Sequence, residues 1–596
     1  MWHTRFVSPT EQYSRRLSER EARLARFDTL NARIGNLRLA LAAAFLITAW
    51  LCFGAAGAAL PWLLIPGAAF IAAVLYHVRV RGSRSRARRA AAFYRAGLGR
   101  IRGQWSGNAP TGERFDVRHH IYGSDLDLFG TDSLFELLCA ARTPMGEDTL
   151  ARWLLAPAGI DLIRERQAGI ADLSDRIDLR EELALQGESA RIELRVDMLL
   201  DWAQAPNRLG RAWIRWTAPL LAVLAIATAS AWAITGLGSP FFAVLAAEAV
   251  LGYFLREPTR AAIVAVETAY EDLKGLSRLL NRIESERFNA PALRALLVKL
   301  SSHSLAASTT FSKLATIVNF AESRRNPLLA PFMLLVMYPL QAALAAERWR
   351  SAHGHVIRGW LDAVGEFEAL VSLAQYAYEH PQDKFPEFVE GPAIFQAADL
   401  GHPLICAADR VCNDVDISGR TRALLVSGSN MSGKSTLLRA VGINTVLAMA
   451  GAPVCAKRLR LTPLQVGASI RIDDSLHEGS SRFYAEITRL KQLFEPVALP
   501  LLFLLDELLQ GTNSADRRVG AQGIIRTLIK RGAIGLISTH DLALTDIAGL
   551  DDGALRNVHF QDELIDGKLH FDFMLHDGIV TKSNGVELMR SIGLDV

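Results

Sequence analysis

A glycine-rich stretch in the last third of the chain carries the side chains best suited to chemistry. Residues 427–436 read SGSNMSGKST and fit the pattern G-x-x-x-x-G-K-[ST]. Glycines at this spacing let backbone N–H groups wrap a phosphate at the N-terminus of a helix. Lys434 would supply a cation to the β- and γ-phosphates of a nucleotide, and Ser435 a hydroxyl ligand for Mg²⁺. The stretch therefore predicts a site for ATP and Mg²⁺ formed by Gly428, Ser429, Asn430, Met431, Ser432, Gly433, Lys434, Ser435 and Thr436.

The flanking residues predict the elements that must position this loop. An apolar strand is expected at 423–426 and a helix at 436–448, which is the context that the motif requires. Farther along, an apolar run ends in Asp506 and Glu507. Asp506 suits the Mg²⁺ shell, and Glu507 suits polarising the attacking water. A further apolar strand ends at His540, which becomes a candidate contact for the γ-phosphate because ligands gather at the ends of parallel strands.

A Gly-Ser stretch between these motifs has two interpretations. Gly479, Ser480 and Ser481 precede a run with helical spacing. Their backbone N–H groups and hydroxyls can face a phosphate. In an ABC-type ATPase that phosphate belongs to the nucleotide bound by the partner subunit. The alternative is an ordinary capped helix, and the residues alone do not separate the two.

The order of these motifs resembles that of ABC ATPases, and their details resemble the MutS family of DNA mismatch repair proteins. The resemblance rests on NMSGKST at 430–436, DELLQGTNS at 506–514, STH at 538–540, NVHF at 557–560 and KSNG at 582–585. Upstream, GHP at 401–403 and TPMG at 143–146 look like the start of that family's ATPase domain and of its helical core. Roughly residues 130–210 and 256–596 share the resemblance.

The resemblance implies an ATPase dimer with two composite sites. The residues at 434, 435, 506 and 507 of one subunit would clamp ATP against the 479–481 loop of the other. Arg410 and Phe573 would flank the adenine; relatives usually have an aromatic residue at the first position, and Arg can stack through its guanidinium plane. Double-stranded DNA is the partner that the family implies. Two departures stand out, because the family's mismatch-recognition domain has no counterpart here and Arg482 stands where relatives commonly have Thr.

Two uncharged stretches indicate membrane-spanning hairpins. Residues 39–78 contain no Asp, Glu, Lys or Arg and break at Pro61-Trp62 into two arms near the ~20 residues that span a bilayer. Residues 216–255 repeat the pattern around a turn at 236–240, with Glu248 as the one charge. This residue either acts within the membrane or, as we favour, reaches its interface. Buried core helices are the alternative interpretation of both stretches.

The arginine distribution predicts the orientation of both hairpins. Arginines flank each stretch, and neither turn carries a charge. By the positive-inside rule both hairpins begin and end in the cytoplasm. The expected location is the cell (inner) membrane as a multi-pass protein, with the N-terminus, the lever and the ATPase domain cytoplasmic. Residues 327–346 are apolar too, but a fifth span would put the ATP site outside the cell, so a buried helix is expected there.

The composition of the chain limits which classes of protein it can belong to. The chain has 596 residues, enough for several domains, and half of them are hydrophobic. A net charge of +4 gives no support for nucleic-acid binding through bulk charge. The five cysteines show no metal-ligand spacing and indicate reduced, mostly buried thiols.

The sequence thus predicts a multidomain protein: an N-terminal transmembrane hairpin, an all-α lever and core domain with a second hairpin, and a C-terminal α/β P-loop domain of ABC type. Residues 261–287 and 290–320 are expected to form long lever helices. The expected divisions are a basic helix at 1–38, a hairpin at 39–78, a basic linker at 79–129, the start of the core at 130–215, a second hairpin at 216–255, the lever and core at 256–379, a linker at 380–394 and the ATPase domain at 395–596.

Three functions follow from this organisation. The first is a membrane-anchored, MutS-like ATPase that couples hydrolysis in a homodimer to DNA binding. The second is a MutS-like ATPase that retains the ATPase domain but acts on the membrane or on an unidentified protein partner without DNA. The third, an ABC-type transporter, has less support because four helices joined by short turns give a poor translocation path.

Overall fold

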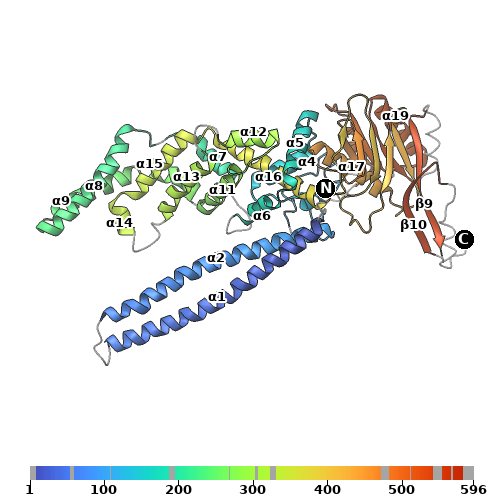
Figure 1. Ribbon diagram of the computed structural model, residues 1–596. Coiled ribbons are helices and arrows are strands. Elements are labelled where there is room, and N and C mark those ends of the chain that lie inside the picture. The colour runs from blue at the N-terminus through green and yellow to red at the C-terminus, as the bar shows by residue number, and fades with distance from the viewer. Residues whose placement is uncertain are drawn as a thin grey trace.

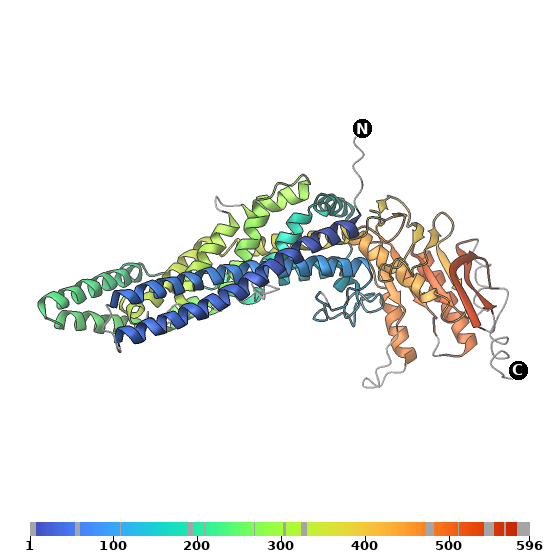
Figure 2. The ribbon, with the colours of Figure 1, turned by 60° about the horizontal axis from the view of Figure 1, so that its bottom comes forward.

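The chain folds into a long two-helix hairpin, an elongated set of further helices and a C-terminal α/β domain (Figure 1). The computed structural model describes residues 8–53, 60–107, 109–186, 195–207, 209–267, 269–301, 306–322, 330–471, 482–509, 512–540, 553–565 and 568–580. The C-terminal domain lies at one end of the molecule, and the tips of two helical hairpins lie at the other end in both views (Figures 1 and 2).

The N-terminal hairpin is longer than its apolar part. Helix α1 runs over Pro9–Phe53 and helix α2 over Leu64–Ile101, joined on the α2 side by a 3₁₀ turn at Leu60–Leu63. The expected divisions at 38 and 78 therefore fall inside continuous helices. The apolar residues form the tip, while Arg84–Asp28 and Arg95–Glu21 pairs join the two helices nearer the base. One continuous hairpin thus carries both the charged and the apolar segments.

The second hairpin consists of α8 (Ala212–Thr235) and α9 (Ser239–Phe254). Gly236 ends α8 at a φ of 77°, a left-handed conformation that suits glycine. Among the described residues, α1, α2 and α8 are long and apolar enough to cross a membrane, and α9 with the start of α10 (Arg256–Glu267) makes a fourth candidate if that pair, bent by 63°, is one span. Glu248 of α9 is only 6% exposed, so its side chain packs against the protein.

The middle of the molecule is α-helical, but its helices are shorter than predicted. Residues 261–287 divide between α10 and α11 (Tyr270–Glu284), and 290–320 between α12 (Pro291–Leu300) and α13 (Ala307–Glu322). The prediction of two long helices is wrong, because α13 turns back to pack its buried apolar face on α11. The Glu284 carboxylate fixes that return by accepting a hydrogen bond from the Ser308 backbone N–H at 3.0 Å.

The apolar run at 327–346 does not form one helix. Its described part contains α14 (Ala330–Leu335) and the first half of α15 (Tyr338–His353). Met337, with a φ of 47°, separates them. Helix α15 buries much of its length, as predicted, whereas Phe332 of α14 is exposed.

Helix α16 (Ile357–Glu379) forms the axis of the core and is buried along most of its length. Around it lie α3 (Leu134–Leu138), α4 (Pro144–Leu155), α5 (Ile160–Ser174) and α12, with α6 (Ile177–Leu185) and α7 (Val196–Gln204) nearby. The TPMG motif has a structural role here. Thr143 caps α4 by accepting from the Gly146 N–H, and its own hydroxyl donates to Glu368 of α16.

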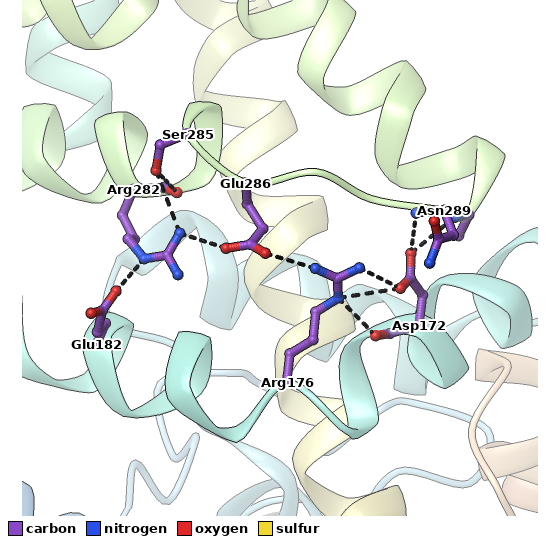
Figure 3. Close-up of polar contacts among 8 residues, drawn as sticks. Asp172, Arg176, Glu182, Arg282, Ser285, Glu286 and Asn289 are labelled. Carbon is purple, nitrogen blue, oxygen red and sulfur yellow. Dashed lines mark hydrogen bonds and ion pairs between the residues drawn. The ribbon is translucent and has the colours of Figure 1, made fainter.

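A polar network joins α5 and α6 to α11 and the segment that follows it (Figure 3). Arg176 pairs with Asp172 at 2.8 Å and with Glu286 at 2.7 Å. Arg282 pairs with Glu286 at 2.6 Å and also contacts Glu182. Since two arginines and three carboxylates alternate, each charge has a partner of opposite sign, which holds the core helices in one arrangement.

The C-terminal domain is built on two sheets. The larger has strand order β10-β9-β4-β8-β7-β6, in which β9 to β6 are parallel and β10 is antiparallel to β9. Its strands are β4 (Ala423–Ser427), β6 (Gln465–Ser469), β7 (Leu501–Asp506), β8 (Ile534–Thr539), β9 (Leu555–Ile565) and β10 (Lys568–Asp577). The smaller sheet has order β1-β5-β2-β3, with β1 (Glu387–Phe388), β2 (Phe395–Leu400), β3 (Asn413–Ile417) and β5 (Arg458–Leu461). Strand β1 comes from the expected linker, so part of that linker is built into this domain.

Helices cover both faces of the larger sheet. Leu424 and Val426 of β4 face the core that contains α17 (Lys434–Ala450), while Leu425 faces the core that contains α19 (Ser514–Lys530) and α18 (Arg482–Gln492). This alternation follows from the period of two in a strand. The central strands are buried on both sides, as expected for a parallel sheet, and their carboxyl ends form one edge.

Candidate functional site

The glycine-rich loop connects the end of β4 to the start of α17. Gly428 and Gly433 have φ values of 151° and 107°, in the region that L side chains rarely adopt. A Cβ at Gly428 would lie 2.8 Å from the Ser432 hydroxyl, so the loop also has no room for a side chain there. Gly433 directly precedes α17, and the free N–H groups of that helix end therefore open into the loop.

The Lys434 ammonium group lies inside the loop. It donates to the carbonyls of Gly428 at 2.8 Å and Ser429 at 2.7 Å, and the residue is 5% exposed. Burial lowers the pKa of Lys434, while the nearby carboxylates of Glu507 and Asp506 act in the opposite direction. A buried cation thus sits where backbone N–H groups converge.

Two acidic residues follow β7 at the same edge of the sheet. The Asp506 carboxylate accepts a hydrogen bond from the Ser538 hydroxyl, which comes from the paired position of β8. Glu507 has a φ of 52°, and its N–H donates to the Ser538 carbonyl at 3.2 Å. His540 Nδ1 lies 3.2 Å from Glu507 Oε1. Strand β8 therefore fixes the Asp506 carboxylate and the backbone of Glu507, and His540 contacts the Glu507 carboxylate.

These groups surround one pocket of about 540 Å³. Of the residues predicted from the sequence, it brings together Asn430, Met431, Gly433, Lys434, Ser435, Thr436, Asp506, Glu507 and Phe573. Gly428, Ser429 and Ser432 complete the loop without lining the pocket. His540 is also outside the lining but contacts Glu507.

Phe573 reaches the pocket because β10 is irregular at this point. The register with β9 shifts between Phe571 and Leu575, and Phe573 has a φ of 54°. Asn413 of β3 stabilises the irregularity, since its amide donates to the Phe573 carbonyl at 3.0 Å and its Oδ1 accepts from the Leu575 N–H at 2.7 Å. The bulge re-aims the ring toward Gly433.

The structure does not bring Arg410 to the pocket. Its guanidinium donates to the Ile405 carbonyl at 2.7 Å and lies 2.6 Å from the Cys455 sulfur, and Arg410 is not among the lining residues. The adjacent Val411 lines the pocket instead. The expected stacking of Arg410 on adenine is therefore corrected: this side chain holds its own loop in place.

Other predicted residues fall outside the described part of the chain, namely Gly479, Ser480, Ser481 and the KSNG stretch at 582–585. Some lining residues were not predicted from the sequence: Leu400, His402, Ile405, Asp409, Val411, Asn413, Leu437, Ala440 and Phe560. His402 and Phe560 lie in the GHP and NVHF stretches whose resemblance to the MutS family was noted, and this signal could have placed them near the site. Leu400, Ile405, Val411, Leu437 and Ala440 carry no signal of their own, because common apolar residues occur throughout the chain.

Comparisons with known proteins match the part of the chain that holds the glycine-rich loop and both acidic residues. Residues 424–595 match the family model for MutS domain V. Endonuclease MutS2 of Thermus thermophilus is 30% identical over 235 residues, which are 39% of this chain and 30% of that protein. The DNA mismatch repair protein MutS of Brevibacillus brevis is 33% identical over 263 residues, or 43% of this chain and 30% of the relative.

A third relative matches with similar identity and coverage. DNA mismatch repair protein MutS 2 of Halobacterium salinarum is 32% identical over 282 residues, or 46% of this chain and 31% of the relative. The chain thus spans about 30% of the length of the curated relatives it matches. Its C-terminal domain is similar to domain V of MutS proteins, and these matches support a relationship of the chain to the MutS family.

Proposed function

We propose that this protein is a membrane-anchored, MutS-like ATPase that hydrolyses ATP in sites shared between two copies and couples hydrolysis to binding of double-stranded DNA. One observation carries the proposal. Lys434, Ser435, Asp506 and Glu507 meet in one pocket, within the region that is similar to MutS domain V.

The residues of the pocket fit MgATP. The hydroxyls of Ser429 and Ser432 are buried and make no hydrogen bond within the described residues, so both are available to a phosphate oxygen. Ser435 and Asp506 offer the oxygen ligands that Mg²⁺ prefers. Bound Mg²⁺ would neutralise the negative charge of the β- and γ-phosphates.

The side chains of this chain then have distinct tasks. Lys434 would exchange its two carbonyl partners for phosphate oxygens. Glu507 would hold and polarise the attacking water, and His540 would keep the Glu507 carboxylate oriented. Phe573 would stack on the adenine. The 479–481 loop of a second copy would complete the site.

Apolar surface at one end of the molecule supports the membrane assignment. Large apolar side chains are exposed at the tips of both hairpins, including Trp50, Phe53, Trp62, Ile234 and Leu237. Exposed apolar area of this kind is expected against lipid and not against water. Both tips lie at the end opposite the C-terminal domain (Figures 1 and 2), which fits a cytoplasmic pocket and a bilayer of the cell (inner) membrane around the tips.

A second candidate function is action on the membrane or on a membrane protein without DNA. The base of the N-terminal hairpin favours it. Arg100 of α2 makes two hydrogen bonds, of 2.7 and 2.6 Å, to Glu379 at the end of α16. The next residues of the chain lead into the C-terminal domain. A change in that domain therefore has a short, buried path to the apolar hairpin.

Duplex binding and ATPase activity of the detergent-solubilised protein separate the two candidates. For the first, we expect DNA to stimulate ATP hydrolysis and its affinity to fall steeply with salt, because phosphate contacts release counterions. Lys434→Ala should weaken nucleotide binding. Glu507→Gln should bind ATP normally, retain it and stabilise the dimer.

The outcomes are distinct. Absence of duplex binding at low salt, with ATPase activity intact, favours the second candidate. Hydrolysis at the wild-type rate by Glu507→Gln would show that this carboxylate has a different role. A wild-type protein that binds no ATP would overturn both candidates.

A further inference from the structure

The segment that follows the N-terminal hairpin packs directly on the C-terminal domain. After α2 ends, residues 121–127, here called the brace, lie along β6, α17 and α18. The Ile121 carbonyl accepts from the Ala468 N–H at 2.9 Å. Leu126 is fully buried, and it lies so close to α17 that a Cβ at Gly442 would be 2.7 Å from its side chain. The brace therefore belongs to the packing of this domain, although it lies about 300 residues before it.

Asp125 is the polar centre of the brace. Its side chain is fully buried, and Oδ1 accepts from the N–H groups of Ile470 at 2.7 Å and Arg471 at 2.8 Å, directly after β6. Oδ2 pairs with the Arg489 guanidinium of α18. One carboxylate thus satisfies donors from the end of a strand and from a helix. If it were lost, the Arg489 guanidinium would lose its carboxylate partner and retain the Ala468 carbonyl at 3.3 Å, and the part-buried N–H groups of Ile470 and Arg471 would lose an acceptor.

Helix α18 carries this restraint to the candidate catalytic residue. Glu486 lies three residues before Arg489, is 1% exposed and accepts a hydrogen bond from the Leu509 N–H. Leu509 and Glu507 have φ values of 59° and 52°. Such a backbone conformation costs free energy in a non-glycine residue and persists only where the surroundings impose it. The Glu486 carboxylate supplies one of the contacts that impose it.

We propose that Asp125 is a positioning residue for the Glu507 carboxylate, acting through Arg489, α18 and Glu486. The proposal rests on the function proposed above. Asp125 does not line the pocket and would not touch ATP. Its effect would be to hold α18, and through it the turn after Asp506, in the arrangement in which Glu507 faces the nucleotide.

Steady-state ATPase kinetics of the full chain in detergent test the proposal. Asp125→Asn keeps the volume but removes the charge and turns an amide N–H₂ group toward Arg489. We expect kcat to fall about tenfold to a hundredfold, as for small displacements of a catalytic group, while KM for ATP changes less than about twofold. The matched control is Asp116→Asn, an exposed carboxylate of the same inter-domain segment that pairs only locally with Arg118, and it should leave both constants unchanged.

A double-variant cycle separates positioning from general stability. Glu486→Ala should lower kcat like Asp125→Asn, and the double variant should lose little more than the worse single variant, because both act on one path. Glu486→Gln retains an oxygen that can accept from Leu509 and should restore most of the rate. If both residues only stabilise the fold, the factors by which the single variants lower kcat should multiply in the double variant. KM for ATP should then rise and thermal stability should fall along with kcat.

Each result decides the matter. If wild type hydrolyses ATP and Asp125→Asn keeps its kcat, the positioning role is wrong while the proposed function stands. If Asp125→Asn does not fold, the kinetics of Glu486→Ala alone decide the question. An unchanged kcat in Glu486→Ala then shows that the positioning role is wrong. If wild type itself neither binds nor hydrolyses ATP, the proposed function fails first, and the two failures are thereby told apart.

Discussion

Phe573 shows how much of the pocket depends on a single backbone conformation. Its ring reaches the pocket because β10 bulges at a φ of 54°. Removing the ring with Phe573→Ala should raise the Kd for a fluorescent ATP analogue roughly fivefold, since an aromatic stacking contact contributes about 1 kcal/mol. Phe571→Ala, next to the bulge but outside the pocket lining, is the control. Equal weakening by both variants would mean that the strand, and not the ring, matters.

Glu368 predicts a pH effect on stability. Burial raises its pKa to about 7, despite hydrogen bonds from the N–H groups of Arg142 and Thr143. Because this value exceeds the ordinary 4.5, the folded protein holds the proton more tightly than the unfolded chain. The stabilisation is fully present below about pH 4.5 and is lost as pH rises through about 7.

Thermal unfolding between about pH 5 and pH 8 measures this linkage. Wild type should lose up to about 3 kcal/mol of stability across the window between the two pKa values. Glu368→Gln cannot titrate, so its melting temperature should depend less on pH. Glu366→Gln changes a half-exposed carboxylate on the same helix and should keep the wild-type slope. A Glu368→Gln slope equal to that of wild type would contradict the assignment.

The sequence allowed the centre of the site to be predicted, but not its walls. The loop at 428–435 is continuous in the chain, so its spacing alone indicates its shape. Asn413 and Phe560 come from separate strands, and only the folded sheets bring them to the pocket. The orientation of Arg410 depends on the Ile405 carbonyl and on Cys455, and no local pattern shows these partners.

Among the elements, the positions of buried strands were easier to predict from the sequence than the ends of helices. Apolar runs at 423–426 and 501–505 can only be satisfied in a sheet covered on both faces, and β4 and β7 are found there. The helical pattern at 261–287 and 290–320 did not reveal where the chain turns back. That turn depends on the tertiary hydrogen bond between Glu284 and Ser308. Conversely, the abrupt change from charged to apolar residues near 38 and 78 suggested element boundaries where two helices simply continue.

The attachment of the N-terminal hairpin can be tested at its buried ion pair. Arg100→Met removes the cation beside the buried Glu379 carboxylate and leaves the Tyr13 hydroxyl, at 3.3 Å, as its side-chain partner within the described residues. Breaking such a pair costs about 3–5 kcal/mol, so amide hydrogen exchange at the base of α1 and α2 should accelerate by about a hundredfold or more. The double variant Arg100→Met/Glu379→Met should recover most of the protection. If the double variant exchanges as fast as the single variant, the pair does not hold the hairpin.

At the scale of the whole molecule, the proposed orientation predicts which residues face the outside of the cell. A cysteine at Ser239, in a Cys52→Ser background, should react in intact cells with a maleimide that cannot cross membranes. A second cysteine replacing Lys384, in the segment that leads into the C-terminal domain, should react only after lysis. Labelling of both positions in intact cells, or of neither, would contradict the proposed topology.

The length of α1 has a mechanical consequence. A helix of 45 residues extends about 68 Å at 1.5 Å per residue. If it tilts by about 5° about the Arg100–Glu379 contact, its far end moves by about 6 Å, more than one helical turn. A rotation of a few degrees at the base of the hairpin would thus move its apolar tip by several ångströms within the bilayer.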